Sequence, residues 1–235
     1  MSKKIILACV ALVAFAAFAI PTAASATNSP ELVEGSNPPV TVPTGTKIVA
    51  TNVGNMVLFE TGGSTPVLSC TTASITGTLI KNDGSNIEAT IESAKIGGTV
   101  GTIIGEPEPE CTGLFNAGVT TLGLHWCIRS TATMATDEFR VGSGTCPTTG
   151  TISFTLQRTK ATGGIEDCIY DSTEALKGIG TTGTDLVHFG RTPHNMNGFT
   201  RTAGAFPCPA STEIEMTFTI ETDTTASNDP IIINS

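Results

Sequence analysis

The sequence predicts an all-β, disulfide-stapled protein: an antiparallel β-sandwich or barrel, built as a single unit possibly with two sub-sheets. Three observations support this fold class. The chain of 235 residues contains 41 threonines and few of the strong helix formers Lys, Arg and Gln, a composition that favours strands over helices. Short stretches of alternating apolar and polar residues recur between Gly-, Pro- and Asn-containing turns. Six cysteines lie beyond the N-terminal segment and suit structural bridges.

The first 26 residues have the pattern of a secretory signal peptide. Lys3 and Lys4 form a positive start, residues 5–20 are almost wholly apolar, and Ala24 and Ala26 flank Ser25 in a small-residue cleavage pattern. The alternative is a membrane anchor, but the apolar run is shorter than the roughly 20 residues that span a bilayer. We therefore expect a secreted, extracellular protein without membrane attachment after cleavage.

The charge balance of the chain is acidic. Cleavage after residue 26 would remove two lysines and take the formal charge from −9 to −11. Such a charge repels phosphate and argues against a nucleic-acid partner. The sequence indicates no cofactor, and it leaves the partner and the oligomeric state open.

The six remaining cysteines are expected to form three disulfides, because no pair has the spacing of a zinc or redox motif. Six cysteines allow 15 connectivities, of which we favour the sequential one. The best-argued bridge links a strand at residues 122–129 to a position just beyond its return strand at residues 138–141. The pairs are Cys70–Cys111, Cys127–Cys146 and Cys168–Cys208.

The N-terminal half should contain several short strands after a flexible arm at residues 27–37. An edge strand can follow at residues 38–43, since proline is tolerated at a sheet edge. Residues 47–50 and 56–59 flank a turn and predict a hairpin. Further strands are expected at residues 67–72, 74–80 and 87–92.

An acidic, proline-containing connector follows these strands. Glu106, Glu108 and Glu110 alternate with two prolines, which excludes a β-ladder and favours an extended, solvated segment. We expect two sub-sheets to divide near it. Calcium binding is the functional alternative, but an extended rod separates the oxygens that calcium needs together.

In the C-terminal half, the clearest alternation falls at residues 152–157 and 213–221. Residues 231–233 suit a closing strand. Residues 171–177 could form a single helical turn at most.

Two sequence patches resemble a family of small exported bacterial proteins of unknown function. The first is LHWCIR, beginning at Leu124, followed by ATMATDEFRV and Cys146; the second is FPCP, beginning at Phe206, followed by MTFTIETD. The resemblance implies export, disulfides and β-structure, and it implies no activity and no catalytic residues. Residues 185–197 depart from the pattern of that family.

No catalytic residues can be assigned. Ser143 lies in a turn without a nucleophile elbow, and paired cysteines leave no free thiolate. Asp137 and Glu138 would point to opposite faces of a strand, which is unsuitable for glycoside hydrolysis. The sole tryptophan, Trp126, is expected to be a core residue beside a disulfide.

Asp185, His188 and His194 are the weak candidates for a binding site, because they gather two of the three histidines near a carboxylate. No metal site is assigned to them. We expect a non-enzymatic secreted surface or interaction module of unknown ligand. The alternatives are a carrier of a small ligand or metal, and an extracellular hydrolase using loop carboxylates and His188/His194.

Overall fold

The computed structural model describes residues 29–35, 38–97, 111–113, 118–135, 137–147, 150–159, 165–191, 198–223 and 230–234, and every regular element in them is a β-strand. The predicted all-β class is confirmed, and residues 171–177 contribute to strands instead of a helical turn. The signal peptide predicted at residues 1–26 and the connector predicted at residues 106–110 lie outside the described residues.

The strands follow one another along the whole chain. Their bounds are β1 Glu31–Glu34, β2 Val40–Thr41, β3 Lys47–Asn52, β4 Met56–Glu60, β5 Pro66–Cys70, β6 Ala73–Asn82, β7 Asn86–Ile96, β8 Cys111–Gly113, β9 Gly118–Leu122, β10 Trp126–Thr131, β11 Glu138–Ser143, β12 Ser153–Thr159, β13 Ile165–Ser172, β14 Leu176–Gly180, β15 Leu186–Phe189, β16 Gly198–Ala203, β17 Ser211–Thr222 and β18 Ile231–Asn234.

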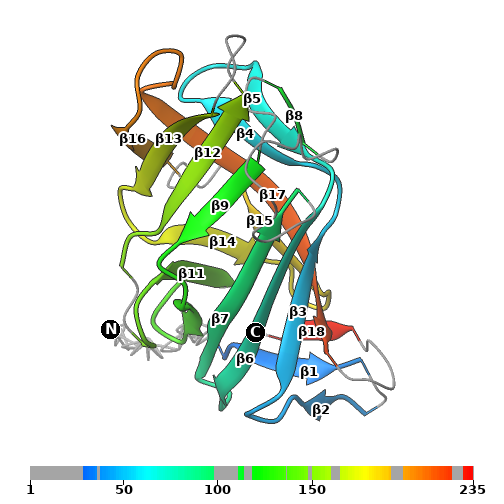
Figure 1. Ribbon diagram of the computed structural model, residues 1–235. Helices are drawn as coiled ribbons and strands as arrows, with labels where there is room; N and C mark the ends of the chain where they lie inside the picture. Colours follow the sequence, from blue (N-terminus) through cyan, green and yellow to red (C-terminus); the bar gives the residue numbers. More distant parts are fainter. Residues whose placement is uncertain are drawn as a thin grey trace, which may run out of the picture.

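Eight strands close into a barrel, in the order β17, β3, β6, β7, β10, β11, β14 and β15 (Figure 1). All their pairings are antiparallel, and β15 closes the circle by pairing with β17, with Leu186 opposite Thr219. The alternative between sandwich and barrel is therefore resolved in favour of the barrel.

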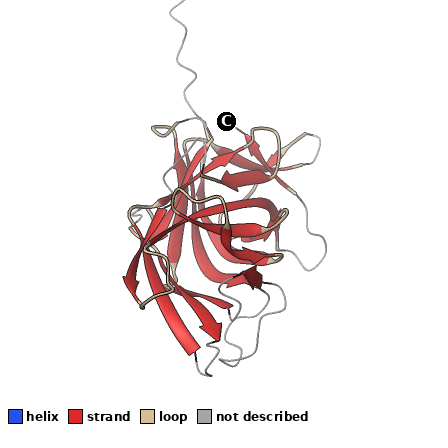
Figure 2. Cartoon of the chain, turned by 90° about the horizontal axis from the view of Figure 1, so that it is seen from above, coloured by secondary structure: helices blue, strands red, loops and turns tan. Residues whose placement is uncertain are grey.

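A second, upper sheet continues the barrel in the order β8, β5, β4, β17, β16, β13, β12 and β9. Each of its strands adjoins a barrel strand along the chain, so that β4 follows β3 and β5 precedes β6, while β17 runs through both sheets. The barrel strands and the upper-sheet strands together form one antiparallel meander. We call the level at which the chain passes from barrel strands to upper-sheet strands the waist. Figure 2 shows the curved walls of this meander. The two sub-sheets do not divide at residues 106–110, because each sheet takes strands from the whole chain.

The predicted hairpin of residues 47–50 and 56–59 is wrong. Strands β3 and β4 do not pair with each other; they lie in line along β17, with Asn52 opposite Phe218 and Val57 opposite Glu215. The turn between them includes Gly54 at φ 74° and shifts the chain without reversing it.

The strand predicted at residues 122–129 is also interrupted at the waist. Gly123 has φ 66°, a left-handed conformation suited to glycine, and it separates β9 from β10. As a result β9 pairs with β12 in the upper sheet, whereas β10 pairs with β7 and β11 in the barrel.

A third sheet of β18, β1 and β2 lies across the lower end of the barrel. The flexible arm expected at residues 27–37 is wrong for Glu31–Glu34, which pairs with the C-terminal strand and buries Leu32 and Val33. Two apolar residues among polar and proline neighbours gave little signal of a strand. The closing strand at residues 231–233 and the edge strand within residues 38–43 are both confirmed.

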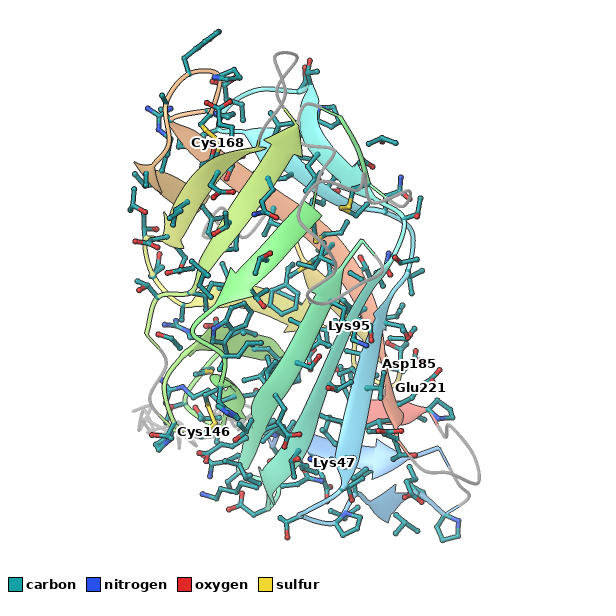
Figure 3. All side chains as sticks on the ribbon, in the orientation of Figure 1. Lys47, Lys95, Cys146, Cys168, Asp185 and Glu221 are labelled. Carbon is teal, nitrogen blue, oxygen red and sulfur yellow. A yellow bond between two sulfur atoms is a disulfide. The ribbon has the colours of Figure 1, made fainter. Side chains whose placement is uncertain are left out.

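All three predicted disulfides are present. The Cα atoms are 4.0 Å apart in Cys70–Cys111, 5.2 Å in Cys127–Cys146 and 5.8 Å in Cys168–Cys208. Cys146 and Cys168, labelled in Figure 3, lie toward opposite ends of the molecule. The bridges therefore crosslink the chain at different positions along the length of the molecule.

Candidate functional site

An apolar cavity of about 110 Å³ lies inside the meander. Its lining comes from both sheets: Ile48 on β3 belongs to the barrel, and Phe199 on β16 belongs to the upper sheet. Thr121 is the one lining residue with a polar side chain. Eight-stranded barrels have room for packed side chains or one small ligand, and this interior keeps free space.

Small residues on one wall create that space. Ala50 on β3, Gly77 on β6, and Ala89 and Ala94 on β7 all line the cavity from adjacent strands. The ladder between β6 and β7 places Gly77 opposite Ile91, and larger side chains from β11, β14 and β15 form the facing wall. The cavity is therefore a consequence of which inward positions carry short side chains.

The lower end of the barrel is closed by the three-stranded sheet. Asn82, at the end of β6, receives a hydrogen bond from the Leu32 amide (2.9 Å) and donates to the carbonyls of Leu32 and Val42 (2.8 and 2.9 Å). Ile231 and Ile233 on β18, within this sheet, are fully buried. The side chain of Asn82 thus fastens the sheet to the barrel.

The upper end is filled by a cluster of aromatic rings. Phe154 stacks on Tyr170 at 5.5 Å and meets Phe199 edge-on at 4.7 Å. Tyr170 donates a hydrogen bond to the Pro209 carbonyl at 3.0 Å. Burial raises the pKa of Tyr170 to about 12, which extends the pH range over which its hydroxyl stays protonated.

In the upper half, no ladder joins the described residues of β8 to those of β9. Strand β10 pairs with β7 from Asn86 to Ile91, and beyond Ile91 strand β7 lies beside β9 without a ladder between them. The described residues of β8 and β9 pair with β5 and β12 but not with each other. Ile96 on β7 and Val119 on β9 both pack against the core and line the cavity.

Trp126 is the first residue of β10. Its side chain is 5% exposed and lines the cavity, and its indole nitrogen donates to the Leu122 carbonyl at 3.2 Å. The expected burial of Trp126 is confirmed. Because Trp126 is the sole tryptophan, its fluorescence can report on the cavity.

The structure does not bring the residues chosen from the sequence into the cavity. His188 lies between the inward-facing Val187 and Phe189 on β15, and its Nδ1 is 2.9 Å from the Thr217 hydroxyl. Asp185, labelled in Figure 3, precedes β15, and its carbonyl accepts a hydrogen bond from Ile220 at 3.0 Å. His194 lies outside the described residues.

Glu138 is the buried carboxylate of the described chain, with 3% exposure. Burial would raise its pKa, but hydrogen bonds from Lys177 and Arg140, both at 2.8 Å, outweigh burial and lower the pKa. The cluster therefore holds a charged carboxylate between two cations. It does not line the cavity, and its geometry indicates a structural ion-pair network.

No group of three His, Cys, Asp or Glu side chains within the described ranges is placed to hold a metal ion. Over the same ranges, no helix is long and apolar enough to cross a membrane. The functional feature that sequence reasoning missed is the apolar cavity. Small residues at inward positions of neighbouring strands are the signal that could have revealed it.

The chain was compared with family models, curated proteins and solved structures, and none of them matches. The resemblance to small exported bacterial proteins therefore stays a prediction. Three disulfides point to an oxidising environment, either extracellular or periplasmic.

Proposed function

We propose that this protein is a non-enzymatic, secreted carrier that holds a small apolar molecule inside its barrel. The observation that carries this proposal is the free volume of about 110 Å³ with an almost wholly apolar lining. Apolar cavities of about this size stay dry and take up small apolar molecules, as does an engineered cavity of about 150 Å³ that binds benzene.

The energetic cost of the cavity supports the proposal. Empty space in a protein interior lowers stability by about 24 cal/mol per Å³, which amounts to roughly 2–3 kcal/mol for this volume. Longer side chains at Ala50, Ala89 or Ala94 would fill the space. A bound apolar ligand would recover the lost contacts without any change of sequence.

The lining favours binding over catalysis. General acid–base and nucleophilic reactions need ionisable or nucleophilic side chains within reach of the substrate, and the lining residues are apolar apart from Thr121. Of the sequence-based expectations, the small-ligand carrier fits the cavity better than the surface module. The hydrolase expectation for Asp185 and His188 has no support in their positions.

Secretion belongs to the same proposal. The disulfides require an oxidising compartment, and the pattern of the first 26 residues provides a route to one. A carrier in that setting would keep an apolar molecule out of water after export.

Quenching of Trp126 fluorescence by 1-bromohexane tests the carrier function. Bromine quenches indole on contact, and Trp126 lines the cavity. We expect saturable quenching of the wild-type protein. Quenching that rises linearly, without saturation, would contradict the proposal.

Two alanine variants separate cavity binding from surface adsorption. Ala89→Leu places a larger side chain in the cavity, and it should abolish saturable quenching while the protein stays folded by circular dichroism. Ala203→Leu makes the same change at an exposed position and should leave quenching unaltered. Equal quenching of both variants would count against a ligand in the barrel.

A further inference from the structure

Three basic side chains lie on neighbouring strands of the outer barrel wall. Arg129 on β10 is directly opposite Arg140 on β11, and Arg140 is directly opposite Lys177 on β14. One chain neighbour of each lines the cavity: Ile128, Val141 and Leu176. The alternation of side chains along a strand therefore points the three basic side chains outward. We call Arg129, Arg140 and Lys177 the basic row.

The basic row is a positive region on an acidic protein. The chain has 12 basic against 21 acidic residues, and like charges directly opposite one another destabilise a sheet. The carboxylate of Glu138 lies 2.8 Å from both Arg140 and Lys177. A single carboxylate offsets one of the three positive charges, so the basic row keeps a positive excess next to Arg129.

Arg129 has no polar partner within the described residues. Its Nε atom is buried and makes no hydrogen bond, whereas the side chains of Arg140, Arg191 and Arg201 each donate one. Glu88 is opposite Arg129 on β7, but no ion pair joins the two side chains. A buried N–H group without an acceptor is unfavourable, so the position of Arg129 calls for a negative partner.

The disulfide Cys127–Cys146 borders Arg129 on one side. Cys127 precedes Arg129 by two residues and therefore lies on the same outer face of β10. The Sγ atom of Cys146, labelled in Figure 3, is 3.6 Å from the Ala89 carbonyl oxygen and 3.9 Å from that of Ile128. The bridge thus holds the segment after β11 against β7 and β10. Arg129 is only part-exposed there, and charges attract more strongly in such a place than in open water.

We propose that the basic row binds a small oxyanion, a phosphate or carboxylate group, between Arg129 and Arg140. Residues directly opposite each other have Cβ atoms about 4.5–5.5 Å apart, so both guanidinium groups can reach one anion. Each guanidinium presents a planar fork of N–H donors that matches two oxygens of such a group. Arg140 bonds to Glu138 through Nε, and its side chain is 39% exposed, so its terminal nitrogens remain available. The anion supplies the acceptor that the Nε atom of Arg129 lacks.

This site is separate from the apolar cavity, because its side chains project from the opposite face of the barrel wall. Amide NMR spectra of the isotope-labelled protein test it directly. Inorganic phosphate and acetate are titrated separately at constant ionic strength, each replacing chloride. We expect saturable shifts of the amide signals around Arg129 and Arg140. A response to phosphate alone identifies a phosphate group as the ligand, a response to acetate alone identifies a carboxylate, and responses to both show that either oxyanion fits. The absence of a saturable response to either anion would overturn the inference.

Matched substitutions connect the response to Arg129. Arg129→Gln removes the guanidinium fork and should weaken anion binding by at least about tenfold, since hydrogen bonds to a charged group are lost. Lys95→Gln removes an exposed positive charge from β7, far from Cys146 in Figure 3, and should leave the affinity unchanged. Equal affinities of the wild type and Arg129→Gln, or an equal loss in both variants, would contradict a site formed by the basic row.

Glu88→Gln provides a test in the opposite direction. It removes the negative charge opposite Arg129 and should strengthen anion binding by about two- to fivefold. If Arg129→Gln does not fold, this variant decides the question. An affinity of Glu88→Gln equal to or below that of the wild type would then overturn the inference.

Discussion

The free space in the barrel lies beside small residues on β3, β6 and β7. Gly77 can only be glycine, because a Cβ atom there would lie 2.5 Å from the Thr90 carbonyl oxygen. Ala89 and Ala94 are alanines with open space before them. Their inward direction depends on the register of β6 and β7, including a shift between Thr76 and Gly77, and no short sequence window contains that information.

Glu138 provides a pH-dependent part of the stability. Its folded-state pKa is lowered from the ordinary value of 4.5, since hydrogen bonds from Lys177 and Arg140 outweigh burial. The stabilisation is therefore fully present above about pH 4.5 and is lost as the pH falls through the lowered folded-state pKa. Glu138→Gln should cost roughly 1–3 kcal/mol at neutral pH, measured by urea unfolding.

Repeating this unfolding measurement at decreasing pH gives the sharper result. The difference between wild type and Glu138→Gln should shrink as the carboxyl is protonated in the wild type. Glu92→Gln is the matched control, because Glu92 pairs with Lys47 (2.7 Å) at an exposed position and should lose less. A difference for Glu138→Gln that stays constant down to acid pH would contradict this account.

At the scale of the strands, clean alternation was predictable and strand partners were not. Residues 213–221 alternate regularly and lie within β17, and the return strand at residues 138–141 lies within β11. The hairpin at residues 47–59 failed because a local turn signal does not distinguish a reversal from a sideways step. That distinction is made by β17, which is distant in sequence and pairs with both β3 and β4.

The middle disulfide was predictable from two neighbouring strands, whereas the bridges over 41 and 40 residues followed only from the sequential order of the cysteines. Cys127 and Cys146 are 19 residues apart, and a loop of about this length gives roughly 3 kcal/mol in the chain-entropy model. A double variant, Cys127→Ser with Cys146→Ser, should lose about that much stability in denaturant unfolding. Wild-type stability in the double variant would show that this bridge does not constrain the chain.

On the scale of the whole molecule, the chain forms one long meander that the three-stranded sheet closes at its lower end. Its candidate site could not be predicted from titratable residues, because Asp185 and His188 lie outside the cavity. The site arises from inward-facing apolar residues contributed by strands along most of the chain. Fold class and bridges follow from local sequence patterns, whereas the cavity exists only once the registers are fixed.

Diffraction from crystals under xenon pressure tests the central claim most directly, since xenon enters dry apolar cavities. We predict an anomalous peak inside the barrel beside Ala89 and Trp126, and its loss in Ala89→Leu. A wild-type barrel without xenon, or one with ordered water at those positions, would contradict an apolar binding cavity.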